Sequence, residues 1–325
     1  MIITRTPLRI SLFGGGTDFP DFYRMHQGAV LSFTIDKYID IALKDRFDRD
    51  IVVQWGGGFQ RVSEVDKVQH ELVREAMKMT GIKEGVEIHT LADIPAEGTG
   101  LGSSSSVTVG ILNVLYAYKG EQVPAQTLAE QACQIEIEIL GKPIGVQDQY
   151  IAAYGGLRFL EFNSDGRVRV EALEIGENKH HLSNNFLLFF TGKTRKSSKI
   201  LAEQKGNIAS KVFVLKKMAK QAKKTRKLIL QGHFNEIGLM LDKGWQLKKK
   251  MASGISNPEI DEMYKRAKRA GALGGKITGA GGGGFLLLYV PPNKQDNVRD
   301  ALRDFREFSF YLERDGSKVI FNIRR

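Results

Sequence analysis

The stretch Pro95-Ala96-Glu97-Gly98-Thr99-Gly100-Leu101-Gly102-Ser103-Ser104-Ser105-Ser106 lies between a short apolar run at 86–91 and an apolar helical pattern at 104–118. Its glycines allow a ligand to approach the backbone closely. At a helix start, unpaired N–H groups and the positive end of the helix dipole favour phosphate. Serines also cap helices and glycines also form turns, but this stretch has more of both than one cap needs. It therefore predicts a phosphate-binding loop, and it is not a P-loop because no Gly-Lys-Ser/Thr ending follows.

A second glycine-rich stretch, Lys276-Ile277-Thr278-Gly279-Ala280-Gly281-Gly282-Gly283-Gly284, lies far away in the sequence. Consecutive glycines lose much conformational entropy on folding and bring no benefit inside a helix or strand. Something must therefore pass close to this backbone. We expect a ligand there, and a packed neighbouring loop is the alternative.

Two further segments place carboxylates near glycine turns. In Arg9–Asp18 a strand pattern runs into three glycines, and Asp18 lies just beyond them. In Gly145–Gln149, Asp148 follows Glu136 by twelve residues. Opposite a phosphate loop, one carboxylate can bind Mg²⁺ and another can engage a reacting hydroxyl. Each signal is weak by itself, because aspartates are common in turns and glutamates on exposed helix faces.

Composition and charge limit the possible classes of protein. The 325 residues include one cysteine, Cys133, which excludes an intrachain disulfide and multi-cysteine metal sites. We find no signal-peptide pattern and no apolar run long enough to span a bilayer, so we expect a cytoplasmic protein without a membrane partner. The net charge is +11, and residues 199–270 hold 18 lysines and arginines against 6 acidic residues. Such a segment is either a solvated helix face or a site for nucleic acid, anionic lipid or phosphorylated small molecules.

The order of predicted elements is mixed β and α. Strand patterns dominate residues 1–62, and one helix is expected over 124–140. A long helical region follows 197, and 308–321 is expected to form a hairpin that turns at Asp315-Gly316. The polar stretch 177–185 is the predicted domain boundary.

Together these motifs resemble those of the GHMP small-molecule kinases. Residues 95–106 are similar to the signature Pro-x-x-x-Gly-Leu-Gly-Ser-Ser-Ala, although Pro95 is spaced slightly further away and serines replace the usual small residues at 105 and 106. Residues 276–284 are similar to the C-terminal motif of the family. The motifs occur in the family order and span 7–284, nearly the whole chain.

Within this superfamily the chain most resembles the heptose-phosphate kinases. Their Pro-Leu-Arg-Ile-Ser-x-x-Gly-Gly-Gly-Thr-Asp is present at 7–18. Galactokinases carry Glu-His where this chain has Gly15-Gly16, which argues against galactose as substrate. The segment 191–198, Thr-Gly-Lys-Thr-Arg-Lys-Ser-Ser, also resembles the heptose-kinase pattern, and its cations and hydroxyls are expected to hold a 7-phosphate. A strand end followed by a helix cap is the alternative for this segment.

The resemblance implies an α+β fold of two lobes, with a ribosomal-protein-S5-like N-terminal domain over 1–180 and a ferredoxin-like C-terminal domain over 181–325. It implies ATP and Mg²⁺ as cofactors, and transfer of phosphate to the anomeric hydroxyl of D-glycero-D-manno-heptose 7-phosphate. The 1,7-bisphosphate product would feed the synthesis of nucleotide-activated heptose. A GHMP kinase for fucose or another hexose is one alternative. A nucleic-acid-binding or regulatory protein with a vestigial kinase site is the other, although we expect no nucleic-acid partner.

The resemblance also implies roles for individual residues. Asp148 would be the base or would only orient the hydroxyl, and Arg9 would lie beside it and stabilise developing charge. Ser104 and Glu136 would bind Mg²⁺, with Ser103 or Ser105 as alternatives to Ser104. The triphosphate would be cradled by Gly100, Leu101, Gly102, Ser103, Ser104 and Ser105. The substrate-binding residues would be Asp18, Gly15, Gly16, Thr17, Lys193, Arg195, Gly281, Gly282 and Gly283.

Overall fold

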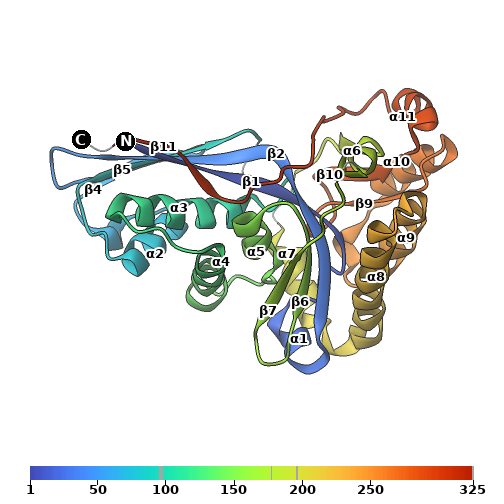
Figure 1. Cartoon of the computed structure of the whole chain (residues 1–325), viewed down its shortest axis with the longest axis horizontal. Coiled ribbons are helices and arrows are strands. Elements are labelled where there is room, and N and C mark those ends of the chain that lie inside the picture. Colours follow the sequence, from blue (N-terminus) through green and yellow to red (C-terminus); the bar gives the residue numbers. More distant parts are fainter. Residues whose placement is uncertain (95–97, 177, 195–196, 324–325) are drawn as a thin grey trace.

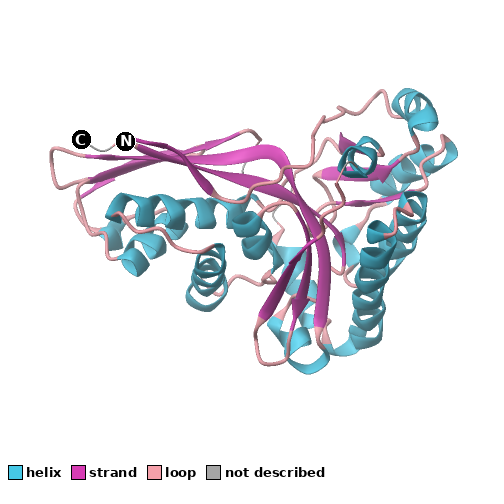
Figure 2. Cartoon of the chain, in the orientation of Figure 1, coloured by secondary structure: helices cyan, strands magenta, loops and turns pink. Residues whose placement is uncertain are grey.

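The computed structural model describes residues 1–94, 98–176, 178–194 and 197–323, and it confirms the predicted mixture of strands and helices (Figure 2). The strands are β1 (Ile2–Phe13), β2 (Gly28–Asp45), β3 (Ile51–Trp55), β4 (Gly58–Val62), β5 (Val86–Ala92), β6 (Leu157–Phe162), β7 (Val168–Ala172), β8 (Phe186–Phe190), β9 (Gly274–Ile277), β10 (Phe285–Tyr289) and β11 (Lys318–Asn322). The α-helices are α1 (Pro20–His26), α2 (Glu71–Thr80), α3 (Ser103–Lys119), α4 (Ala125–Cys133), α5 (Gln147–Tyr154), α6 (Asn178–Asn184), α7 (Ser198–Gly206), α8 (Val212–Leu230), α9 (Phe234–Lys248), α10 (Pro258–Arg269) and α11 (Gln295–Ala301).

The larger of two sheets is built on the long strands β1 and β2. Its order is β11-β1-β2-β5-β3-β4. The first part of β2, residues 28–33, also pairs with β6, and β6 pairs with β7. Helices α2, α3, α4 and α5 lie on one side of this sheet (Figure 1). Helix α3 packs directly on β1 and β2, which brings the start of α3 close to β1.

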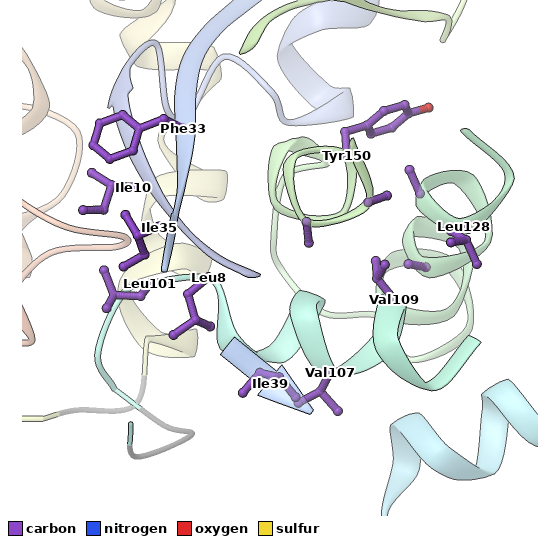
Figure 3. Close-up of a cluster of buried hydrophobic side chains, with 14 of the residues drawn as sticks. Leu8, Ile10, Phe33, Ile35, Ile39, Leu101, Val107, Val109, Leu128 and Tyr150 are labelled. Atoms are coloured by element: carbon purple, nitrogen blue, oxygen red, sulfur yellow. The ribbon is translucent and has the colours of Figure 1, made fainter. Parts of the chain in front are cut away.

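Most buried apolar side chains of the larger sheet and of the helices packed on it belong to one cluster, which also contains residues of β8, β10, α8 and α9. Figure 3 shows its members from β1, β2 and the helices below them, including Leu8, Ile35 and Val109. Leu101 lies in the same cluster, so the loop before α3 is attached to the core through a fully buried side chain.

The smaller sheet, in the order β8-β10-β9, lies between two apolar clusters. Successive residues of a strand point to opposite faces. Phe186 and Leu188 accordingly pack in the larger cluster, whereas Leu187 and Phe189 pack in the second one. Both faces are buried, which explains why 186–190 is a continuous apolar run.

The second cluster includes residues from α7 to α10, which hold the excess positive charge. On α8, Leu215, Met218 and Ala222 are buried. The exposed lysines of this helix are Lys216, Lys217, Lys220, Lys224 and Lys227. The charged stretch therefore forms the solvated face of an amphipathic helix. In the described part of the chain, no helix is both long and apolar enough to cross a membrane.

The predicted hairpin over 308–321 is wrong. Residues 308–317 form no strand and make one isolated bridge, Leu312 with Ile35, and β11 pairs antiparallel with β1 instead. The C-terminal strand thereby returns to the first strand, and the amino group of Met1 donates to the carbonyl oxygen of Ile323 at 3.0 Å. The structure has no turn at 315–316, so the turn-forming residues Asp315 and Gly316 do not by themselves reveal which strand the chain pairs with.

The helix expected over 124–140 is confirmed over most of its length, but its second half is not α-helical. Helix α4 ends at Cys133, and residues Gln134–Ile139 continue as a π-helical turn. The wider turn inserts an extra residue into the helical phase, so Glu136 points into the protein while Glu138 remains exposed.

Helix α9 packs against β9 at two glycines, and this contact yields a stability prediction. A Cβ at Gly274 would lie 2.0 Å from the carbonyl oxygen of Gly238 on α9. Gly274→Ala should therefore lower the free energy of unfolding by about 1–3 kcal/mol, because it separates helix from strand. Gly206→Ala is the control, since a Cβ there has no neighbour within 4 Å. Urea unfolding that is equal for both variants would contradict the tight contact.

Candidate active site

A cavity of about 470 Å³ opens where the two glycine loops meet β1 and the start of α5. Twelve of the residues singled out from the sequence line it, namely Arg9, Gly15, Gly16, Asp18, Gly100, Gly102, Ser103, Ser104, Ser105, Asp148, Gly281 and Gly283. Residues more than 270 positions apart in the sequence are thus brought to one site by the return of β9 and β10 toward β1.

The loop before α3 ends in backbone geometry that only glycine adopts easily. Gly100 and Gly102 have φ angles of 75° and 79°. A Cβ at Gly102 would lie 2.9 Å from Cγ of Arg9, so the loop also needs the small residue for space. Helix α3 begins at Ser103, and the first N–H groups of a helix lack partners within it. The start of α3 therefore lies at the cavity, with the positive end of the helix dipole directed toward it.

Arg9 and Asp148 form a bidentate ion pair at the cavity wall. Nε of Arg9 donates to Oδ1 of Asp148 at 2.7 Å, and Nη2 donates to Oδ2. Nη1 of Arg9 also donates to the carbonyl oxygen of Gly100 at 2.6 Å. Arg9 is buried, whereas the Asp148 side chain is 23 % exposed and faces the cavity. One carboxylate is therefore held in a fixed orientation next to the phosphate loop.

Asp18 is a buried carboxylate that organises the other end of the cavity. Its Oδ1 accepts from the backbone N–H of Gly16 at 2.8 Å, and its Oδ2 accepts from Nε2 of Gln147 at 3.0 Å. Burial raises the pKa of Asp18, and the nearby charge of Asp148 adds to this. Gln147 was not identified as a site residue from the sequence, although it lies within the quoted segment 145–149.

Two polar atoms at this end have no hydrogen-bond partner among the described residues. These are Oγ of Ser11 and Oε1 of Gln147, and both residues line the cavity. Buried polar atoms are normally paired. Their position fits a ligand with several hydroxyl groups.

Glu136 is fully buried and is surrounded by hydrogen-bond donors. It accepts from Oγ of Ser104 at 2.6 Å, from Oγ of Ser105 at 2.8 Å and from Nε2 of Gln149 at 2.8 Å. Burial raises its pKa, although the charge of Lys142, whose Nζ lies 3.8 Å from Oε1, counteracts this. Lys142 lines the cavity and was missed from the sequence, since a lone lysine in a loop carries no signal.

The second glycine loop packs against the first, which confirms the alternative of a neighbouring loop, and the ligand expected there stays a prediction. A Cβ at Gly279 would lie 2.5 Å from Cα of Gly100, which shows how closely the two backbones approach. Gly281 and Gly283 line the cavity. Gly282 does not line it, because its N–H donates to the carbonyl oxygen of Ile255 at 2.8 Å.

Three other residues that were expected to bind ligand make contacts within the protein instead. The hydroxyl of Thr17 is buried and donates to the carbonyl oxygen of Gly14 at 2.8 Å, so it stabilises the turn. Leu101 has its side chain in the core, and its carbonyl oxygen accepts from the N–H of Arg9 at 2.9 Å. Lys193 is exposed, forms an ion pair with Glu259 and does not line the cavity. Arg195 lies outside the described residues.

Lys248 is a cavity-lining residue that the sequence analysis did not identify. It is the last residue of α9, it is 6 % exposed, and its Nζ donates to the carbonyl oxygen of Gly279. Burial, together with the charge of Arg9, lowers the pKa of Lys248 to about 8. The sequence did contain a signal for its burial, because positions 237, 241, 245 and 248 follow the spacing of one buried helix face.

Comparison with known proteins gives a consistent family. The model of the GHMP kinases N-terminal domain matches residues 67–156, and that of the GHMP kinases C-terminal domain matches 225–307. The chain is 32 % identical over 333 residues to a D-glycero-alpha-D-manno-heptose 7-phosphate kinase of Campylobacter jejuni, with 96 % of this chain and 97 % of that protein covered.

Solved structures agree. A putative sugar kinase of Campylobacter jejuni is 30 % identical, with a TM-score of 0.75 and 98 % of this chain and 97 % of that one covered. A heptose 1-phosphate kinase of Bacteroides thetaiotaomicron has a TM-score of 0.83 at 24 % identity, and each chain is covered completely, which supports the fold.

The buried ion pair yields a prediction on stability. Removal of one partner leaves the other charge without compensation. Arg9→Met and Asp148→Asn should each destabilise the protein, and the double variant should be less destabilised than their sum by a coupling energy of about 1–3 kcal/mol. Chemical unfolding of the four proteins measures this. Strictly additive effects would mean that the two side chains do not act as a pair.

Proposed function

Because the chain belongs to the GHMP kinases and is an ATP-dependent sugar kinase, we propose that it phosphorylates the anomeric hydroxyl of a heptose 7-phosphate. The product would be the 1,7-bisphosphate, a precursor for nucleotide-activated heptose. The observation that carries the proposal is the Asp148 carboxylate, oriented by Arg9 at the cavity wall beside the phosphate loop. The 32 % identity to the Campylobacter jejuni enzyme supports the heptose substrate.

The phosphates of ATP would bind at the start of α3. The N–H groups of Ser103, Ser104 and Ser105 would face the phosphates at this helix end, and the glycines before them would leave room for them. Phosphoryl transfer depends mainly on positioning and on neutralisation of charge, which this loop and the Arg9 guanidinium provide.

Asp148 would engage the sugar hydroxyl. Arg9 holds both oxygens of this carboxylate, and part of the side chain is exposed to the cavity. The carboxylate can therefore accept the hydroxyl proton as the new bond to phosphorus forms. The same geometry would suffice to orient the hydroxyl without a full proton transfer.

The carboxylate of Glu136 and the hydroxyl of Ser104 are oxygen ligands of the kind that Mg²⁺ binds. The ion prefers oxygen ligands and is usually held by one or two carboxylates together with substrate phosphates. Glu136 and the hydroxyl of Ser104 lie together at the phosphate loop and would hold it there. When bound, the ion neutralises charge on the phosphate oxygens.

The sugar would bind at the end of the cavity organised by Asp18. Asp18, Gln147 and Ser11 offer acceptors and donors for hydroxyl groups, and Gly15 and Gly16 leave space for a substrate larger than a hexose. Lys193 is directed to Glu259 in this structure, so a role in binding the 7-phosphate would require it to leave that partner. Arg195 stays a proposed phosphate ligand.

A substrate panel tests the proposal. ADP release should be measured with heptose 7-phosphate, unphosphorylated heptose, fucose and galactose, and NMR should locate the phosphates of the product. Turnover that is highest with heptose 7-phosphate and yields a phosphate at C1 supports the proposal. A preference for fucose or galactose would instead assign this GHMP kinase to another sugar.

The role of Asp148 gives a kinetic prediction. Asp148→Asn should lower turnover by at least ~10²-fold, because positioned acid–base groups contribute about 10²–10⁴-fold. The affinity for ATP should change little, since Asp148 faces the acceptor side. Asp165→Asn, at an exposed turn, serves as the control. Turnover near that of the parent would remove Asp148 from this role.

The proposed metal site gives a second kinetic prediction. Ser104→Ala and Glu136→Gln should each raise the Mg²⁺ concentration required for half-maximal activity, because the ion loses an oxygen ligand or a negative charge. Glu138→Gln is a matched control, since Glu138 lies in the same π-helical turn but is exposed. If the Mg²⁺ titrations of all three variants overlap with that of the parent, the assignment of this site is incorrect.

A further inference from the structure

Lys248 is a buried cation that the roles proposed above do not use. It is the last residue of α9 and lines the cavity together with residues of α3 and α5. Burial of an ammonium group is costly, and an apolar residue would pack at this helix position without that cost. The one described hydrogen bond of its Nζ goes to the carbonyl oxygen of Gly279, and an ammonium group has three donors.

The contacts of Gly279 locate this ammonium group relative to the phosphate loop. Gly279 packs on Gly100, and the carbonyl oxygen of Gly100 accepts from Arg9. Arg9 and Lys248 are therefore anchored to two carbonyl groups of adjoining backbones. Arg9 is neutralised by Asp148, whereas no carboxylate forms an ion pair with Lys248 among the described residues.

We propose that Lys248 is a further catalytic residue, whose ammonium group donates to an equatorial oxygen of the phosphoryl group during its transfer. The inference rests on the proposed reaction site beside Asp148. In this step the sugar oxygen forms a bond to the γ-phosphorus, the bond from that phosphorus to the bridging oxygen of ADP breaks, and the hydroxyl proton passes to Asp148. Lys248 keeps its proton throughout and stabilises negative charge.

The charged surroundings of Lys248 are consistent with this role. Arg9 on β1 and Lys276 on β9 disfavour its protonation, whereas Asp18 before α1 and Asp148 on α5 favour it. These opposing charges, together with burial, leave the pKa of Lys248 at about 8. The protonated form is therefore lost as the pH rises through that value, and a phosphate dianion in the cavity would favour its retention.

Three variants test the proposal with whichever sugar the parent enzyme uses best, so that a different sugar specificity does not affect the outcome. Lys248→Met removes the charge, and Lys248→Arg keeps it at high pH. Lys249→Met is the matched control, because Lys249 is the next residue and forms an ion pair with Asp261.

We expect Lys248→Met to lower kcat by about a hundredfold, the typical loss for one preorganised donor to a developing charge. The affinity for ADP should change little, whereas the affinity for ADP with tetrafluoroaluminate and sugar, which mimics the phosphoryl group in transfer, should fall by a similar factor. Isothermal titration measures both. Equal losses for the two ligands, or a kcat equal to that of Lys249→Met, would overturn the proposal.

The pH dependence provides an independent readout. For the parent, kcat/KM should fall above a pH of about 8 as Lys248 loses its proton. This decrease should move to higher pH in Lys248→Arg and be absent in Lys248→Met. If Lys248 only fixed the glycine loop, both variants would melt at lower temperature and keep the parental pH profile. That result would also overturn the proposal, and the profile of Lys248→Met suffices if Lys248→Arg does not fold.

Discussion

The guanidinium group of Arg9 connects three parts of the structure that are distant in sequence. It extends from β1, pairs with Asp148 on α5 and donates to the carbonyl oxygen of Gly100 before α3. A buried cation must have its donors satisfied, so these three segments can occupy only one relative arrangement. The backbone of Arg9 adds a bond to Leu101, whose side chain is itself held in the core. The position of the phosphate loop thus depends on the buried charge of Arg9.

Much of this arrangement could be predicted because the relevant signals are local. Glycines at 98, 100 and 102 followed by serines indicate a helix start open to an anion, and the structure has α3 begin at Ser103. The glycines of 279–284 indicated a close approach to the backbone, and the structure has both a neighbouring loop and a cavity there. Neither stretch indicates by itself that the two loops touch.

The features that could not be predicted depend on distant partners or on helical phase. The strand 318–322 has no pattern that reveals its pairing with β1, and a one-residue change of phase at 134–139 decides that Glu136 rather than Glu138 is buried. Lys248 is one of three consecutive lysines, and only its place on the inner face of α9 distinguishes it from its neighbours. In all three cases the deciding contact comes from another part of the chain.

The pairing of β11 with β1 also constrains the order in which the molecule can fold during its synthesis. The first strand leaves the ribosome more than 300 residues before its outer partner does. Until then, the edge of β1 has unpaired N–H and C=O groups that can pair with other extended chains. Contacts between such distant residues form slowly because a long loop must close first. The outer edge of β1 therefore stays open to pairing with other extended chains until residues 318–322 have been synthesised.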